Sequence, residues 1–171
     1  LGLVGEFTIR DNLILGYHNR PSFQRFKVLR VNHIKRHAAE LRERFAIKSE
    51  SIDTKVQALS GGNQQKVVIG RVLSQDPIVI IAAQPTRGVD IGAIEYIHQQ
   101  LIEMRDQGKA VLLISAELDE IRKLSDKIAV IYEGRIVAHG PRDSFDEFEL
   151  GSYMTRGKAI NEPRKETNAD E

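Results

Sequence analysis

The first third of the chain has apolar residues at helical spacing. In residues 8–18, Thr8 or Asp11 could serve as the helix cap. Residues 31–45 form a second apolar face. The apolar positions are Ile9, Leu13, Leu15 and Tyr17 in the first segment, and Val31, Ile34, Ala38, Leu41 and Phe45 in the second. This spacing predicts that residues 8–48 are helical.

After Leu59 the pattern changes to short β-branched runs separated by helical segments. A helix that Gly108 ends separates the first two runs, and a shorter helix around residues 118–124 separates the next two. The predicted strands are Ile78–Ala83, Ala110–Ser115, Ile128–Tyr132 and Arg135–Ala138. Such alternation predicts βαβ crossovers and a parallel sheet covered by helices on both faces. Residues 132–135 predict a tight turn between the last two strands.

The composition is that of a globular protein, with 41% hydrophobic and 29% charged residues among 171. Cysteine is absent, which excludes disulfides and thiolate metal sites and favours a reducing compartment. No apolar run approaches the roughly 20 residues of a membrane helix. Because the sequence starts at Leu1, without an initiator Met or a signal-peptide pattern, we expect Leu1 to mark a cut inside a longer protein.

The net charge of +1 conceals a basic block from Arg20 to Lys48, where nine Lys and Arg stand against two Glu, a net +7. Such a block suits phosphates, an anionic membrane surface or a solvated helical face. We favour the solvated face, because the long basic side chains alternate with good helix formers and no RNA-binding motif accompanies them. His33 and His37 have a metal-ligand spacing but no third ligand, so we interpret them as surface histidines.

The strongest local motif is LSGGNQQK, which spans Leu59–Lys66 directly before an apolar helical run. Ser60 suits a helix N-cap, and Gly61 and Gly62 leave the backbone open to an approaching anion. The free N–H groups and positive end of the helix then favour phosphate binding. Taken alone, however, the motif fits a plain capped helix better than a ligand site.

The motifs around this helix resemble the nucleotide-binding domain of ABC-type ATPases. LSGGN stands where that family has its LSGGQ signature; the pair Pro85-Thr86, Asp90 at the D-loop position and SDKIAVIYEGRIV over residues 125–137 follow in the expected order. The resemblance covers Thr8–Gly140. The signature variant with Asn63, and AAQPTRGVDIGA after it, are similar to the second nucleotide-binding domain of the sugar and ribonucleoside importers.

This resemblance implies an α/β, P-loop NTPase-like fold that lacks the N-terminal phosphate-loop portion, with a helical subdomain and a largely parallel sheet flanked by helices. We expect residues 1–58 to be the mostly helical subdomain. Residues 59–154 would hold the signature helix and the core half, and residues 155–171 a polar tail. Neither a GxxxxGK[ST] loop nor a Q-loop is found in the chain. We therefore expect the chain alone to be inactive and to bind ATP weakly.

Three positions depart from the family pattern. The resemblance implies an Asp that binds Mg²⁺ and a Glu that positions water at the end of the first strand, where this chain has Ala83 and Gln84. The family's switch histidine falls at Ala116. Alanine offers no oxygen ligand to Mg²⁺, and an amide is no general base. We expect this site to be degenerate, with no catalytic residue intact in cis and no metal ligand.

The intact residues belong to the other half of the mechanism. In the family, two domains pair head to tail, and the signature of one covers the ATP held by the other. By this resemblance, the residues acting in trans are Ser60, Gly61, Gly62, Asn63 and Gln64, with Asp90 in the D-loop. The hypothesis is one competent and one impaired site per pair, with ATP and Mg²⁺ as cofactors of the full protein.

The implied partners are a second nucleotide-binding domain, fused upstream, and the membrane permease, which the helical subdomain docks. An extracytoplasmic solute-binding protein takes part indirectly, and no nucleic acid is expected. The resemblance places the protein peripherally on the cytoplasmic face of the membrane, where the basic block would favour the anionic leaflet. It implies ATP hydrolysis coupled to sugar or nucleoside uptake.

Two other function classes agree with parts of the sequence. A soluble ABC protein that acts on ribosomes or nucleic acid would use the basic block as its contact, but would be expected to keep the Asp-Glu pair that Ala83 and Gln84 replace. A purely structural or regulatory module would have no use for the signature around Ser60. The sequence upstream of Leu1 would decide between them.

Overall fold

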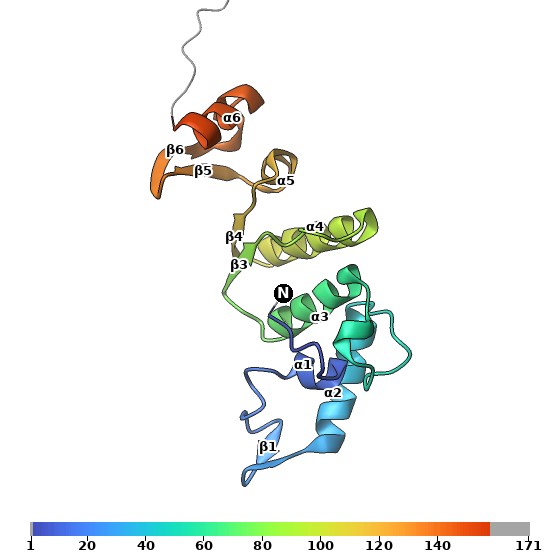
Figure 1. Ribbon diagram of the computed structural model, residues 1–171. Helices are drawn as coiled ribbons and strands as arrows, with labels where there is room; N and C mark the ends of the chain where they lie inside the picture. Colours follow the sequence, from blue (N-terminus) through green and yellow to red (C-terminus); the bar gives the residue numbers. More distant parts are fainter. Residues whose placement is uncertain (1, 158–171) are drawn as a thin grey trace, which may run out of the picture. The chain divides into compact units, whose positions relative to one another are not determined.

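The computed structural model describes residues 2–157. The chain forms two compact units, Leu1–Leu112 and Leu113–Glu171 (Figure 1). The predicted division into 1–58, 59–154 and 155–171 stays a prediction, and residues 158–171 of the predicted tail lie outside the described residues. Within residues 2–157, no helix combines the length and the apolar character needed to cross a bilayer.

The first unit begins with a short helix and a hairpin. Its first elements are α1 (Ile9–Leu13), β1 (Gln24–Arg25), β2 (Val28–Leu29) and α2 (Val31–Arg44). Thr8 caps α1, because its hydroxyl accepts a hydrogen bond from the Asp11 N–H at 3.1 Å. The prediction of helix throughout residues 8–48 is wrong between α1 and α2. Pro21 lacks a backbone N–H, and two residues at the hairpin tip have positive φ, so this segment cannot continue a helix.

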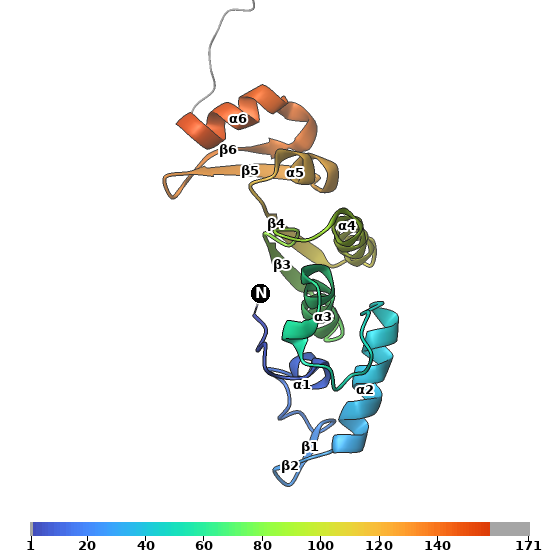
Figure 2. The same ribbon diagram turned by 45° about the vertical axis from the view of Figure 1, so that its right-hand side comes forward.

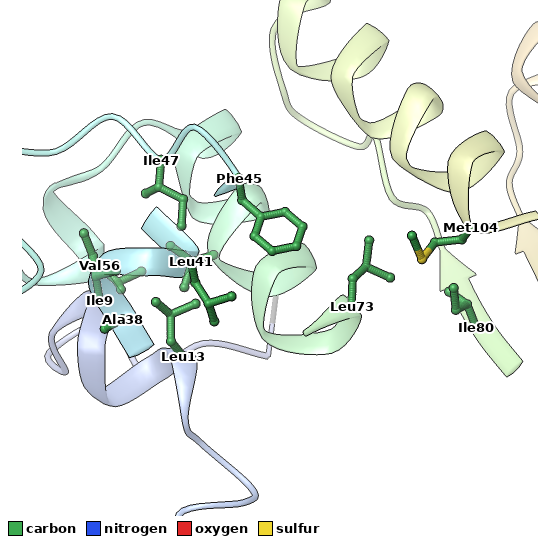
Figure 3. Close-up of a cluster of buried hydrophobic side chains, with 11 residues drawn as sticks. Ile9, Leu13, Ala38, Leu41, Phe45, Ile47, Val56, Leu73, Ile80 and Met104 are labelled. Carbon is green, nitrogen blue, oxygen red and sulfur yellow. The ribbon is translucent and has the colours of Figure 1, made fainter. Parts of the chain in front are cut away.

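The apolar face predicted for residues 31–45 is confirmed for four of its five positions. Ile34, Ala38, Leu41 and Phe45 are buried. Val31 is 51% exposed, because it is the first residue of α2 and lies beside the hairpin. The helix packs on α1 and on α3 (Gly61–Leu73) through this face. Figure 3 shows the resulting cluster of buried side chains.

The remaining elements of this unit end in a βαβ segment, whose last strand runs on past Leu112. They are the 3₁₀ helix η1 (Val56–Ala58), α3, β3 (Val79–Ala83), α4 (Ile91–Asp106) and β4 (Ala110–Ile114). β3 and β4 are neighbours in a two-stranded sheet, joined also by the Ala110 N–H donating to the Ile78 carbonyl at 2.9 Å. Gly108 has φ +80° after α4, which confirms the predicted helix end.

The sheet of β3 and β4 is not covered on both faces by the described residues. Ile80 is 4% exposed and joins Leu73 and Met104 in the core (Figure 3). On the other face Val79 is 59% and Ile81 66% exposed. The predicted two-sided coverage is therefore wrong for the described residues, because α3 and α4 cover only the face that carries Ile80.

The second unit is an antiparallel hairpin with helices. Its elements are α5 (Leu118–Leu124), β5 (Lys127–Tyr132), β6 (Arg135–Pro141), the 3₁₀ helix η2 (Arg142–Ser144) and α6 (Glu147–Arg156). The predicted tight turn is confirmed, since Tyr132 pairs with Arg135, and Glu133 and Gly134 have φ of 46° and 75°. Ile128, Val130 and Leu150 form the core.

Two features of the second unit differ from prediction. Within residues 2–157, β5 pairs with β6 and not with β4, so the second predicted crossover is wrong. Burial alternates along β5, which is typical of an antiparallel strand with one buried face. Helix α6 was not predicted. It includes Thr155, the first residue of the expected tail, and a capping box between Asp146 and Glu149 starts it.

Candidate functional site

The start of α3 is held by a set of side-chain hydrogen bonds. The Ser60 hydroxyl accepts hydrogen bonds from the Asn63 N–H at 3.4 Å and from the Asn63 amide nitrogen at 3.0 Å. The Asn63 amide oxygen accepts from the Lys48 N–H at 2.8 Å. Ser60 thus has the N-cap role expected for it, and Asn63 ties the cap to the segment after α2.

The two glycines after Ser60 pack closely against the start of α4 and the loop before it. A Cβ on Gly62 would lie 2.9 Å from both the Ala93 Cβ and the Asp90 Oδ2. A Cβ on Gly61 would lie 3.2 Å from the Gly88 carbonyl oxygen. The sequence motif alone suggested only that glycine admits an anion. The structure adds that the missing side chain at Gly62 lets the start of α4 pack closely against α3.

Asp90 performs for α4 the task that Ser60 performs for α3. Its Oδ1 accepts a hydrogen bond from the Ala93 N–H at 2.9 Å, so Asp90 is the N-cap of α4. Ser60, Gly61 and Asp90 are all exposed. The structure therefore brings the predicted signature and D-loop residues together on one accessible surface, where the starts of two helices meet.

This surface is suited to an anion on its α3 side. The first intrahelical bond of α3 runs from the Gln64 N–H to the Ser60 carbonyl at 2.9 Å, so the N–H groups of Gly61 and Gly62 precede it. No acidic residue lies in the first turn of α3. Because the positive end of the helix dipole adds to these donors, a phosphate group fits beside Ser60 and Gly61.

The two glutamines of the motif bind the protein itself. The Gln64 amide nitrogen donates to the carbonyls of Val56 at 3.3 Å and Leu59 at 3.1 Å. The Gln65 amide nitrogen donates to the Pro85 carbonyl at 2.8 Å. Sequence reasoning missed Gln65 as a link between α3 and the loop after β3. Its only sequence signal was a polar residue at a position on the inner face of the predicted helix.

The positions predicted to be degenerate do not form a metal site. Ala83 is the last residue of β3, Gln84 follows it with φ 49°, and Ala116 is exposed after β4 in the second unit. No cluster of three acidic, His or Cys side chains that could hold a metal ion occurs in residues 2–157. A hollow of about 530 Å³ borders Ala83 and Gln84, and Arg87 is its only charged lining residue. Mg²⁺ therefore does not fit the residues present here.

The histidine pair on α2 packs on an aromatic ring. The Phe23 ring centroid lies 5.9 Å from that of His33 and 4.9 Å from that of His37. His37 is half-buried, and burial lowers its pKa. The expectation that both are surface histidines is thus wrong for His37, because Phe23 from the hairpin segment covers it.

Comparison with known proteins matches these features to one family. The family profile described as ABC transporter matches residues 2–87. The chain is 46% identical over 161 residues to the nucleoside import ATP-binding protein NupA of Lactococcus lactis subsp. cremoris (strain MG1363), covering 94% of this chain and 32% of NupA. It is 37% identical over 158 residues to the glucose import ATP-binding protein TsgD13 of Haloferax volcanii, covering 91% and 29%. The chain thus spans about a third of the length of these curated relatives.

The fold also matches solved structures. A dimeric ATP-binding cassette in a post-hydrolysis state, bound to ADP and Pi, superimposes with a TM-score of 0.66 and 25% identity. The match covers 82% of this chain and 59% of that cassette. The arrangement of α3, β3, α4 and β4 is therefore that of part of such a cassette.

Proposed function

Because the chain belongs to the ABC transporter family, we propose that it is part of the ATP-binding subunit of a nucleoside or sugar importer. In this proposal, the subunit couples ATP binding and hydrolysis to solute uptake. The observation that carries it is the exposed start of α3 with Ser60 and Gly61, which has no acidic residue in its own first turn and offers backbone donors to phosphate. The nucleoside class is favoured, since NupA is 46% and TsgD13 37% identical to the chain.

The phosphate at this surface is supplied from elsewhere in the assembly. Within residues 2–157 the described contacts around Ser60 include no Lys or Arg side chain that would grip a triphosphate, and the matched cassette is dimeric. We therefore propose that Ser60, Gly61 and Asp90 face ATP bound by a second nucleotide-binding domain. Asn63 acts indirectly by holding the cap, and Gln64 by fixing the turn before the helix.

The chain's own half of a nucleotide site lacks the groups that catalysis needs. Ala83 and Gln84 supply neither a carboxylate for Mg²⁺ nor a general base, and general-base catalysis contributes about 10²–10⁴-fold. Ala116 supplies no imidazole. We propose that the complete protein has one competent site, to which this chain contributes in trans, and one impaired site. Mg²⁺ and ATP would be cofactors of the competent site.

The further partners follow from the same assignment. A permease and an extracytoplasmic solute-binding protein would complete the importer, and the subunit would lie peripherally at the cytoplasmic face of the membrane. The helices of the first unit, including α1 and α2, are the proposed permease contact.

The test separates the cap of α3 from its contact with phosphate. Aspartate is as good an N-cap as serine, so Ser60→Asp keeps the helix but places a negative charge against the phosphate. In the reconstituted importer, we expect Ser60→Asp to lower ATP turnover and uptake at least about tenfold, because one lost charge-assisted hydrogen bond alone accounts for that factor. Ser60→Asn, a neutral cap, is the matched control. Equal turnover in Ser60→Asp and Ser60→Asn would refute the proposal.

A further inference from the structure

The hairpin of β1 and β2 has an unusual tip. Gln24 pairs with Leu29 and Arg25 with Val28, so Phe26 and Lys27 form a two-residue loop. Their φ angles are 50° and 63°. Positive φ at both loop positions is typical of a type I′ turn, where Asn-Gly is the preferred pair. A bulky side chain is strained there, and such strain persists at positions that serve a function.

The hairpin presents apolar side chains to solvent. Phe26 is 87% exposed, Val28 68% and Val31, at the start of α2, 51%. β1 and β2 lie at the end of the first unit away from α3 and α4 in both views (Figures 1 and 2). The Arg25 guanidinium lies 5.2 Å from the centroid of the Phe26 ring. An aromatic ring at the apex is thus paired with a cation rather than with the protein core.

The charge around this tip has a single sign. No acidic residue occurs between Asp11 and Glu40. Six Lys and Arg side chains lie in that interval, all exposed: Arg20, Arg25, Lys27, Arg30, Lys35 and Arg36. Among residues 2–157, none of the six forms an ion pair with a carboxylate. Beside the hairpin, a hollow of about 490 Å³ is lined by Arg30, His33 and Arg36, among others.

We propose that this hairpin docks on an anionic phospholipid bilayer, with Phe26 inserted among the headgroups and the surrounding cations on lipid phosphates. Charge complementarity selects an anionic partner. The exposed Val28 and Val31 favour lipid over nucleic acid, because aliphatic side chains gain from acyl chains but add nothing to phosphate or base contacts. The inference stands on the hairpin's own residues and goes beyond the proposed transport function.

Vesicle sedimentation with the chain measures this docking. We expect the chain to pellet with phosphatidylcholine–phosphatidylglycerol vesicles, not with phosphatidylcholine alone, and to be released by salt. Phe26→Asp should abolish binding, and Lys27→Gln should weaken it about fivefold, since one cation near an anionic surface contributes about that factor. The matched control is Phe148→Asp on α6, where Phe148 is 64% exposed but lies between Glu147 and Glu149.

A second variant separates docking from folding. Phe26→Asn with Lys27→Gly installs the preferred type I′ pair, so it should raise the thermal midpoint while it removes vesicle binding. A third variant, Phe26→Trp, reports the insertion of the tip into the bilayer through its fluorescence. The chain has no tryptophan, so Phe26→Trp places the only indole at the tip. Its emission should shift to the blue with phosphatidylglycerol vesicles, whereas that of Phe148→Trp should not.

Three outcomes would overturn the proposal. These are equal binding to neutral and anionic vesicles, unchanged binding in Phe26→Asp, and an unshifted emission of Trp at position 26. Capture of single-stranded RNA that Phe26→Asp abolishes, without vesicle binding, would assign the surface to nucleic acid instead. Loss of permease assembly in Phe26→Asp, without vesicle binding, would assign it to a protein. ATP turnover of the complete importer in detergent, where no bilayer is present, tests the proposed transport function independently of these three outcomes.

Discussion

At Gly62 the packing of two helices leaves no room for a side chain. Helix propensity alone favours Gly62→Ala by about 1 kcal/mol. However, the added methyl would meet the Ala93 Cβ and the Asp90 carboxylate at 2.9 Å. Overpacking of this kind costs about 1–3 kcal/mol, so after the propensity gain we expect a net loss of up to about 2 kcal/mol in the free energy of unfolding, measured by urea denaturation. In Gly151→Ala, within α6, no atom lies within 4 Å of the added Cβ, so this control should be stabilised by about 0.5–1 kcal/mol.

His37 makes stability depend on pH. Burial lowers its pKa, and this effect outweighs the attraction of Glu40 and adds to the repulsion from His33. The unfolded chain therefore binds the proton more readily, so the contribution of His37 is present above the unfolded pKa of about 6.5 and is lost as the pH falls from there through the lower pKa of the folded state. We expect urea midpoints to fall between roughly pH 7.5 and 5, and His37→Gln to flatten this fall.

The quantity to compare for His37 is the slope of stability against pH, not the urea midpoint itself, because His37→Gln also removes the ring that packs against Phe23. His18 is exposed, and His18→Gln supplies the control. Identical pH slopes in wild type and His37→Gln would contradict the assignment.

Single elements differ in how far the sequence predicts them. The 3.6-residue spacing of Ile34, Ala38 and Leu41 gave α2, and Ser60 gave the start of α3, because caps and apolar faces are local signals. The hairpin tip at Phe26 and Lys27 was missed, since these residues are not turn formers. The contact of Gly62 with Ala93 could not be predicted either. It joins residues from two helices, and only the folded chain brings them together.

The sequence carries a local signal for the start of α6, the capping pair Asp146 and Glu149, which the spacing of apolar residues does not reveal. The Asp146 carboxylate accepts from the Glu149 N–H at 2.7 Å, and the Glu149 carboxylate accepts from the Asp146 N–H at 3.2 Å. We expect Asp146→Ala to destabilise the second unit by about 0.5–2 kcal/mol, seen as a lower midpoint of helix signal in thermal melts. Asp143→Ala is the control, since it breaks only an exposed ion pair with Arg142. Equal losses in the two variants would show that the cap is unimportant.

None of the described residues covers one face of β3. Val79 is 59% and Ile81 66% exposed. Contiguous apolar surface of this kind promotes association. We expect the isolated chain to self-associate with rising concentration in sedimentation velocity, and Ile81→Lys to reduce this. Ile91→Lys, at a similarly exposed isoleucine (77%) off the strand, should not. A chain that stays monomeric at all concentrations would contradict the expectation.

The contact between the starts of α3 and α4 also restricts how the proposed site can move. Gly62 packs closely against Ala93 and Asp90, and Gln65 donates to the Pro85 carbonyl in the loop that leads to α4, so both contacts resist a shift of one helix end relative to the other. We therefore expect Ser60 and Asp90 to move together. A nucleotide that binds them meets a preorganised surface. Binding then does not have to order two separate loops and lose their conformational entropy.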